Sequence, residues 1–131
     1  MRKLKGLIIM LSILASLFGM TACSDGGANS YEQITPEQAK SIMDTESEYI
    51  IIDARTAEEF AEGHIEGAVL LDHVDVKSKA HVVLPDKNAL ILVYCRSGRR
   101  SKIASEELVK LGYTNVKEFG GIIDWPYEIV K

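Results

Sequence analysis

The chain has 131 residues, 47% of them apolar and 26% charged, which suffices for one domain with a modest core but not for two. Its 15 basic and 19 acidic side chains give a net charge of −4. Such an acidic protein lacks the basic face that binding to a phosphate backbone requires, so nucleic acid is not expected as a partner.

The first 22 residues predict a secretory signal peptide. Arg2, Lys3 and Lys5 precede an apolar run at residues 7–18. These 12 residues are too few to cross about 30 Å of hydrocarbon as a helix. Removal of this leader would leave 12 basic against 19 acidic side chains, a net charge of −7.

The end of the leader and the residue after it read "MTAC", residues 20–23, which resembles the lipobox of bacterial lipoproteins. This resemblance implies acylation of the Cys23 thiol and export to the extracytoplasmic or periplasmic face of a membrane, with the lipid as anchor. An ordinary secretory signal with an incidental cysteine is the alternative. The polar, glycine-rich residues 23–30 are typical of a flexible tether, and the folded domain is expected over residues 31–131.

Two segments carry complete helix-start signals. Residues 35–38, "TPEQ", combine an N-cap threonine, a proline at the first helical position and a glutamine that closes a capping box. Thr56 and Glu59 form a second capping box, which predicts a short helix with Phe60 turned inward. A third helix is expected after Cys95.

That third helix is predicted to bury Ile103, Ala104, Leu108 and Leu111, and to end at Gly112 in a left-handed cap. Apolar runs predict strands at residues 49–53, within 63–71, at 89–94 and at 115–119. The run at 89–94 is the most apolar and is expected at the centre of the sheet. Residues 74–86 fit no period well and are expected to be irregular or weakly helical.

Strands that alternate with helices predict an α/β fold with a central parallel sheet flanked by helices on both faces. In such sheets ligands bind at the carboxyl ends of the strands. Cys95 lies at this position, between the most apolar strand and a helix. It also lacks a disulfide partner if Cys23 carries lipid, because the chain has two cysteines.

Cys95 is therefore a candidate nucleophile. Four cations follow it within seven residues, and cations and a helix N-terminus stabilise a thiolate relative to a thiol. A glycine in the same loop permits the tight curvature of an anion cradle. A small core cysteine beside a solvated basic face is the alternative, which the clustering of cations in an acidic protein disfavours. The cations are Arg96, Arg99, Arg100 and Lys102.

Residues 93–125, which begin "VYCRSGRRS", and residues 50–71, which begin "IIIDARTAEEF", resemble the two halves of a rhodanese domain. The resemblance spans roughly residues 34–125 and is weakest at 74–86. It implies a three-layer sandwich and a sulfurtransferase that needs no cofactor. Cys95 would carry a sulfane sulfur, as a persulfide, from thiosulfate or a persulfide donor to cyanide or a thiol. The substrate-binding residues would be Arg96, Ser97, Gly98, Arg99, Arg100 and Ser101.

Two alternatives remain open, a cysteine-dependent phosphatase or arsenate reductase and a non-catalytic rhodanese-like binding module. Cysteine phosphatases place five residues between the cysteine and an arginine. Here that position is Ser101, and Arg100 arrives one residue early. The tighter loop favours sulfur over a phosphoryl group, and retention of Cys95 disfavours the binding module.

Other polar residues are expected to be structural. Asp53 and Arg55 at the end of a strand are predicted to tie loops together, and His64 to lie in a turn. The remaining histidines have no partners at metal-ligand spacing, so no metal site is expected. Gly120, Gly121 and Trp125 are predicted to shape the last turn, with Trp125 as a candidate pocket wall.

Overall fold

The computed structural model describes residues 30–131. The predicted signal peptide, Cys23 and all but the last residue of the predicted tether lie outside the described residues. In this described part of the chain, no helix is long and apolar enough to cross a membrane.

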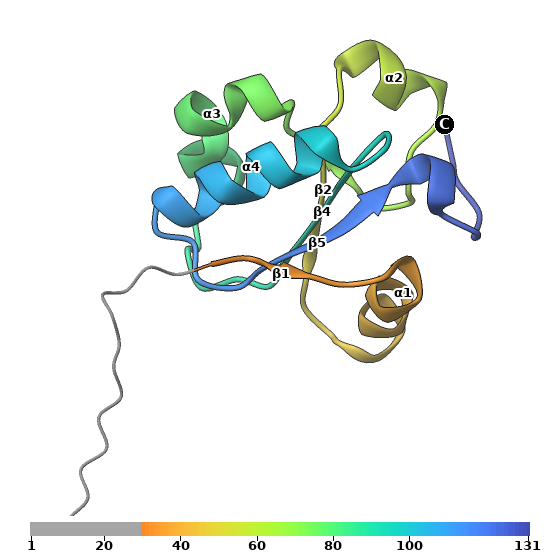
Figure 1. Cartoon of the computed structure of the whole chain (residues 1–131), viewed down its shortest axis with the longest axis horizontal. Coiled ribbons are helices and arrows are strands. Elements are labelled where there is room, and N and C mark those ends of the chain that lie inside the picture. Colours follow the sequence, from red (N-terminus) through yellow and green to blue (C-terminus); the bar gives the residue numbers. More distant parts are fainter. Residues whose placement is uncertain (1–29) are drawn as a thin grey trace, which may run out of the picture.

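Five parallel strands form one sheet in the order β1-β5-β4-β2-β3, with helices on both faces (Figure 1). The elements in chain order are β1 (Glu32–Gln33), α1 (Pro36–Thr45), β2 (Ile50–Asp53), α2 (Ala57–Glu62), β3 (Val69–Leu70), α3 (Val76–Val83), β4 (Ile91–Cys95), α4 (Arg99–Lys110) and β5 (Val116–Gly121). This confirms the predicted α/β class and the central position of the 89–94 run.

The predicted helix starts are confirmed in atomic detail. The Thr35 side chain accepts a hydrogen bond from the Gln38 amide at 3.0 Å and caps α1. Thr56 caps α2 in the same way through the Glu59 amide at 3.2 Å. Gly112, with φ of +100°, follows α4 in the left-handed conformation that glycine adopts at lowest cost.

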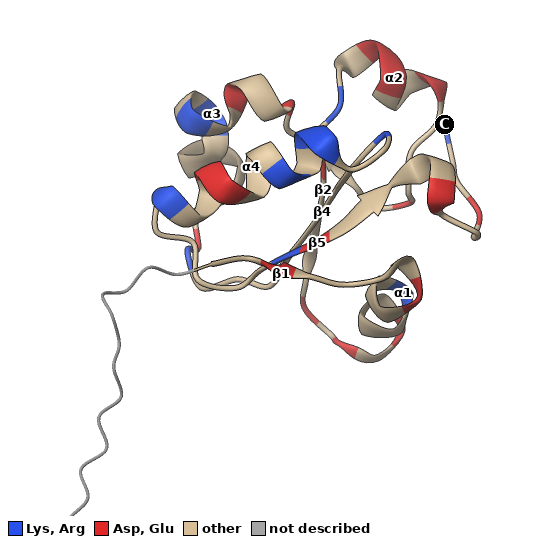
Figure 2. Cartoon of the chain, viewed as in Figure 1, with Lys and Arg blue, Asp and Glu red and all other residues tan. Residues whose placement is uncertain are grey.

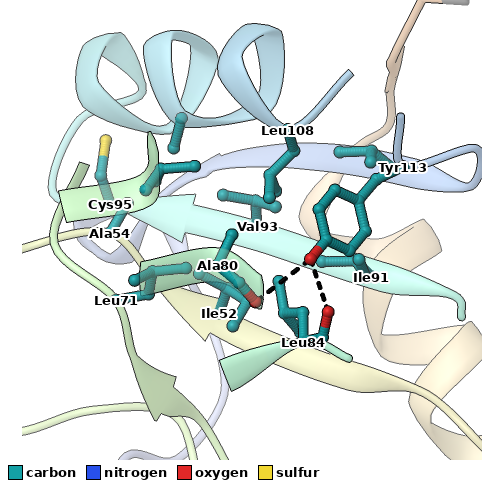
Figure 3. Close-up of a cluster of buried hydrophobic side chains, with 13 residues drawn as sticks. Ile52, Ala54, Leu71, Ala80, Leu84, Ile91, Val93, Cys95, Leu108 and Tyr113 are labelled. Atoms are coloured by element: carbon teal, nitrogen blue, oxygen red, sulfur yellow. Dashed lines mark hydrogen bonds between the residues drawn. The ribbon is translucent and has the colours of Figure 1, made fainter. Parts of the chain in front are cut away.

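Each face of the sheet buries its own apolar cluster. Alternate residues of β4 point to opposite faces, so Ile91, Val93 and Cys95 lie under α3 and α4, whereas Leu92 and Tyr94 lie on the α1 side. Figure 3 shows the first cluster, with Cys95 at one end and Tyr113 at the other. Since β4 is buried on both faces, packing fixes the position of the Cys95 backbone.

The structure differs from the sequence predictions at several elements. Strand β1 was not predicted, and residues 76–83 form a regular helix, α3, in the segment expected to be irregular or weakly helical. Ile103 was wrongly assigned to the buried face of α4, since it is 42% exposed. Phe60 is only half-buried and stacks on the His64 ring, with centroids 3.7 Å apart.

Candidate active site

Cys95 is the last residue of β4. The sequence prediction placed it directly after the strand. It is 1% exposed and lies opposite Gly121 of β5, next to an irregularity in the β4–β5 register. Its Sγ accepts a hydrogen bond from the Gly98 amide at 2.9 Å. Gly98 has φ of +110° and is the N-cap of α4, so the loop curls back over the sulfur.

The first turn of α4 surrounds this loop with donors and positive charge. The first intrahelical hydrogen bond of α4 runs from the Lys102 amide to the Gly98 carbonyl. The amides of Arg99, Arg100 and Ser101 come before it and therefore have no acceptor within the helix. Arg96, Ser97 and Arg99 are exposed, and within residues 30–131 neither Arg96 nor Arg99 forms an ion pair. The loop is therefore suited to hold an anion.

Arg100 has a different role, because its side chain reaches α2. Its Nη1 and Nη2 atoms donate to both oxygens of Glu59, at 2.7 and 2.9 Å. This hydrogen-bonded pair lowers the pKa of Glu59 to about 2. Figure 2 shows the basic first turn of α4 near the acidic α2. Glu59 thus fixes Arg100 beside the loop, a contact that the sequence analysis did not identify.

Ser101 and Glu118 lie behind the thiol, both buried. The Ser101 Oγ atom is 3.4 Å from the Cys95 Sγ atom, and its hydroxyl donates to the Glu118 carboxylate. The role of Ser101 in substrate binding stays a prediction. In the structure its side chain is buried behind the sulfur. Glu118 was missed, although an acidic residue inside the strand "NVKEF" is an available signal.

Gly121 allows the cysteine loop to rest directly on β5. A Cβ atom at this position would be 2.5 Å from the Ser97 Cα atom and still closer to the carbonyl of Arg96. That carbonyl also accepts a hydrogen bond from the Ile123 amide at 3.2 Å. Gly121 was predicted to shape the last turn, and the structure shows that its lack of a side chain positions the loop.

Asp53 and Arg55 form a buried ion pair on the α1 side of the sheet. Arg55 donates to both oxygens of Asp53, the shortest contact being 2.7 Å, and to the Gly63 carbonyl at 2.7 Å. The Tyr94 hydroxyl donates to the same carboxylate at 2.7 Å and accepts from the Ile65 amide. Burial, then the Asp53 charge, raises the pKa of Tyr94. These contacts join the β2–α2 connection to the loop before β3.

The other predicted residues lie away from the sulfur. His64 exchanges two backbone hydrogen bonds of 2.8 Å with Val130. Trp125 lines a groove of about 790 Å³ with α1 and the C-terminal segment, and this groove includes no residue of the cysteine loop. No group of three potential metal ligands exists within residues 30–131.

Comparison with known proteins places this geometry in context. Residues 35–126 match the rhodanese-like domain family. Thiosulfate sulfurtransferase PspE of Escherichia coli (strain K12) is 40% identical over 80 residues, covering 61% of this chain and 77% of that protein. The adenylyltransferase and sulfurtransferase UBA4 of Candida albicans is 30% identical over 104 residues, 74% of this chain but 24% of that protein. A structure of a rhodanese with anions from E. coli has a TM-score of 0.60 and 37% identity, covering 63% and 98% of the two chains.

Proposed function

The chain belongs to the rhodanese-like domain family, in which its relatives include proteins named thiosulfate sulfurtransferases, and we propose that it transfers a sulfane sulfur through a persulfide on Cys95. One observation carries the proposal. The Cys95 sulfur lies at the carboxyl end of the central strand and accepts the Gly98 amide at 2.9 Å, inside a loop that opens α4.

The proposed reaction has two displacement steps. The Cys95 thiolate attacks the outer sulfur of thiosulfate, the sulfur–sulfur bond of the donor breaks, and sulfite leaves with the bonding electron pair. A thiolate or cyanide then attacks the outer sulfur of the Cys95 persulfide, and the cysteine thiolate leaves. The loop amides and the exposed guanidinium groups of Arg96 and Arg99 bind the anionic donor and the charge that develops on the departing sulfite.

Two contacts favour sulfur over phosphate as the transferred group. Ser101 occupies the position of the phosphatase arginine, and its side chain is buried and bonded to Glu118. Arg100, one residue earlier, is bonded to Glu59 of α2 rather than extended over the loop. Neither side chain is placed to bind the oxygens of a phosphoryl group as the phosphatase arginine does.

Intact-mass analysis of the purified protein tests the proposal. Thiosulfate is expected to add about 32 Da, one sulfur atom, to the wild type and nothing to Cys95→Ser, as for a covalent intermediate. The same wild-type preparation is expected to convert cyanide to thiocyanate and to leave aryl phosphates intact. An equal mass gain in both proteins would refute the assignment of Cys95, and aryl phosphate hydrolysis through Cys95 without sulfur transfer would support the phosphatase alternative.

The "MTAC" sequence supports a second part of the proposal, namely that the protein is exported and held on the cell membrane by lipid on Cys23. Two or more acyl chains anchor a protein stably where one does so only marginally. Wild type is expected to sediment with membranes and to incorporate labelled palmitate, and Cys23→Ala to incorporate none. Unlabelled, soluble wild type would make Cys23 an incidental cysteine.

A further inference from the structure

The buried carboxylate of Glu118 is a group that the proposed displacement steps do not use. It is 1% exposed, and within residues 30–131 it has no cationic partner. It accepts hydrogen bonds from the Gly120 amide at 2.9 Å, the Gln33 side-chain amide at 3.3 Å and the Ser101 hydroxyl. A buried charge without a counter-ion is costly, so its place behind the thiol calls for a reason in the chemistry.

The hydrogen bonds from the thiol to this carboxylate run in one direction. A carboxylate can only accept, so the single hydroxyl proton of Ser101 is drawn to Glu118 rather than to the carbonyls of Gly98 and Gly120, which lie 3.0 and 3.4 Å from Oγ. The Ser101 Oγ atom is then left as an acceptor for the thiol of Cys95, 3.4 Å away. All three side chains are buried, so this chain of hydrogen bonds is shielded from bulk solvent.

We propose that Ser101 and Glu118 form a proton relay that takes up the proton of the Cys95 thiol and returns it. The thiol proton moves to the Ser101 Oγ atom while the hydroxyl proton of Ser101 moves to the Glu118 carboxylate. The products are a thiolate and a neutral carboxylic acid, and the total charge of the three side chains stays at one negative. The new thiolate accepts two hydrogen bonds, from the Ser101 hydroxyl and from the Gly98 amide.

The proton transfer itself is argued from the contacts, and only its use in sulfur transfer rests on the proposed function. During the first displacement Glu118 would hold the proton while the thiolate attacks the donor. After the second displacement the proton would return through Ser101 to the departing Cys95 thiolate. The site would thus generate a nucleophile without releasing a proton to solvent, and Glu118 acts as a positioning residue because it reaches the sulfur only through Ser101.

Other charged groups near the relay keep one protonation state over the neutral pH range, or affect the relay only through another residue. Arginine stays protonated throughout, and the pKa of Glu59 is lowered to about 2. The pKa of Tyr31, near Glu118, is raised by burial and then by the charges of Glu106 and Glu118, so its phenol stays neutral. The pKa of Arg100 is raised by its hydrogen bond to Glu59 and, to a smaller extent, by the charge of Asp72, so Asp72 reaches the cysteine loop only through Arg100. The charged or titratable groups that interact with Cys95 or Glu118 are Arg100, which is paired with Glu59, and Tyr31, which also lies near Glu106.

The pH dependence of Cys95 alkylation tests the relay without any sulfur donor. The full chain is treated with iodoacetamide at a series of pH values, and labelling of the Cys95 peptide is followed by mass spectrometry. A base that takes up the thiol proton as the sulfur attacks speeds labelling where few thiols have lost their proton to solvent. We therefore expect the labelling rate of Glu118→Gln near neutral pH to be about tenfold or more below that of the wild type, and the two rates to converge at alkaline pH, where hydroxide removes the thiol proton in both.

Ser101→Ala is the second variant, because it removes the link while keeping the carboxylate and adds no bulk. It is expected to slow labelling near neutral pH as Glu118→Gln does. Glu32→Gln, which neutralises an exposed carboxylate on the neighbouring strand β1, is the matched control and is expected to keep the wild-type rate. Wild-type rates near neutral pH in Glu118→Gln or in Ser101→Ala would overturn the relay, and so would an equal slowing at every pH. Because alkylation needs no sulfur transfer, the relay can fail while thiosulfate still adds mass to Cys95, and the converse can also be seen.

Discussion

Replacing Gly121 by alanine tests how closely the cysteine loop must rest on β5. The added Cβ would lie 2.5 Å from the Ser97 Cα atom and still closer to the Arg96 carbonyl, whereas ordinary contact begins at 3.4 Å, so the loop must move outward by at least about 1 Å. A misplacement of about 1 Å at a reacting group can cost about 10²-fold in rate, which corresponds to about 2.7 kcal/mol in the activation free energy. Overpacking of this kind typically lowers stability by about 1–3 kcal/mol.

The assay is the initial rate of thiocyanate formation from thiosulfate and cyanide, with urea unfolding to measure stability. The matched control is Gly120→Ala. Gly120 has φ of +92°, but a Cβ there would meet nothing within 4 Å, so this variant adds backbone strain without pushing the loop. We expect Gly120→Ala to lose stability and to keep a much larger share of the rate than Gly121→Ala. A folded Gly121→Ala protein with a rate within twofold of wild type would refute the reasoning.

Three further predictions concern contacts around the site. Glu59→Gln is expected to lower the free energy of unfolding by about 1 kcal/mol at pH 7, because it weakens a partly exposed pair with Arg100. The pKa of Glu59 is about 2 in the folded chain and 4.5 ordinarily. The pair therefore stabilises the protein fully above pH 4.5, and this stabilisation is lost as the pH falls toward 2. A difference in unfolding free energy between wild type and Glu59→Gln that stays constant down to pH 3 would contradict the assignment. Tyr113→Phe removes a buried hydroxyl whose single proton is donated to the Leu84 carbonyl, with the Ala80 carbonyl at 3.1 Å, and should cost about 1–2 kcal/mol in urea unfolding. An unchanged midpoint would contradict a contribution of this bond to stability. Asp53→Asn leaves the buried Arg55 charge uncompensated and should cost about 3–5 kcal/mol in the same assay, whereas a loss below 1 kcal/mol would mean that the guanidinium group reaches solvent.

The sequence predicted the fold wherever the signal is local. Capping boxes, a strongly apolar strand and a glycine after α4 each depend on residues within a few positions of one another, and each is confirmed. Strand β1 escaped prediction because it has two residues and is defined only by its pairing with β5. The buried face of α4 was misjudged at Ile103 because two serines, Ser101 and Ser105, occupy buried positions and break the apolar period on which the prediction relied.

The candidate site shows the same division. The cysteine loop is continuous in sequence, so the strand-to-helix junction around Cys95 could be predicted. Glu59, Glu118 and Gly121 enter the site from other elements, and their distances from Cys95 along the chain carry no information about contact. Whether Gly121 or Gly120 lies beneath the loop depends on the β4–β5 register and its irregularity, and a shift of one residue would exchange their positions.

The parallel arrangement of the sheet also determines how the domain would face its surroundings. All strands start at the same edge, so β1 begins at the edge opposite the carboxyl end of β4 (Figure 1). Cys95 is the last residue of β4, so it lies at that opposite edge. If lipid on Cys23 holds the protein, as proposed, the attachment lies at the amino edge of the sheet, and the cysteine loop lies at the opposite edge. A bulky protein that delivers or collects sulfur could then dock from the open side without competing with the bilayer for space.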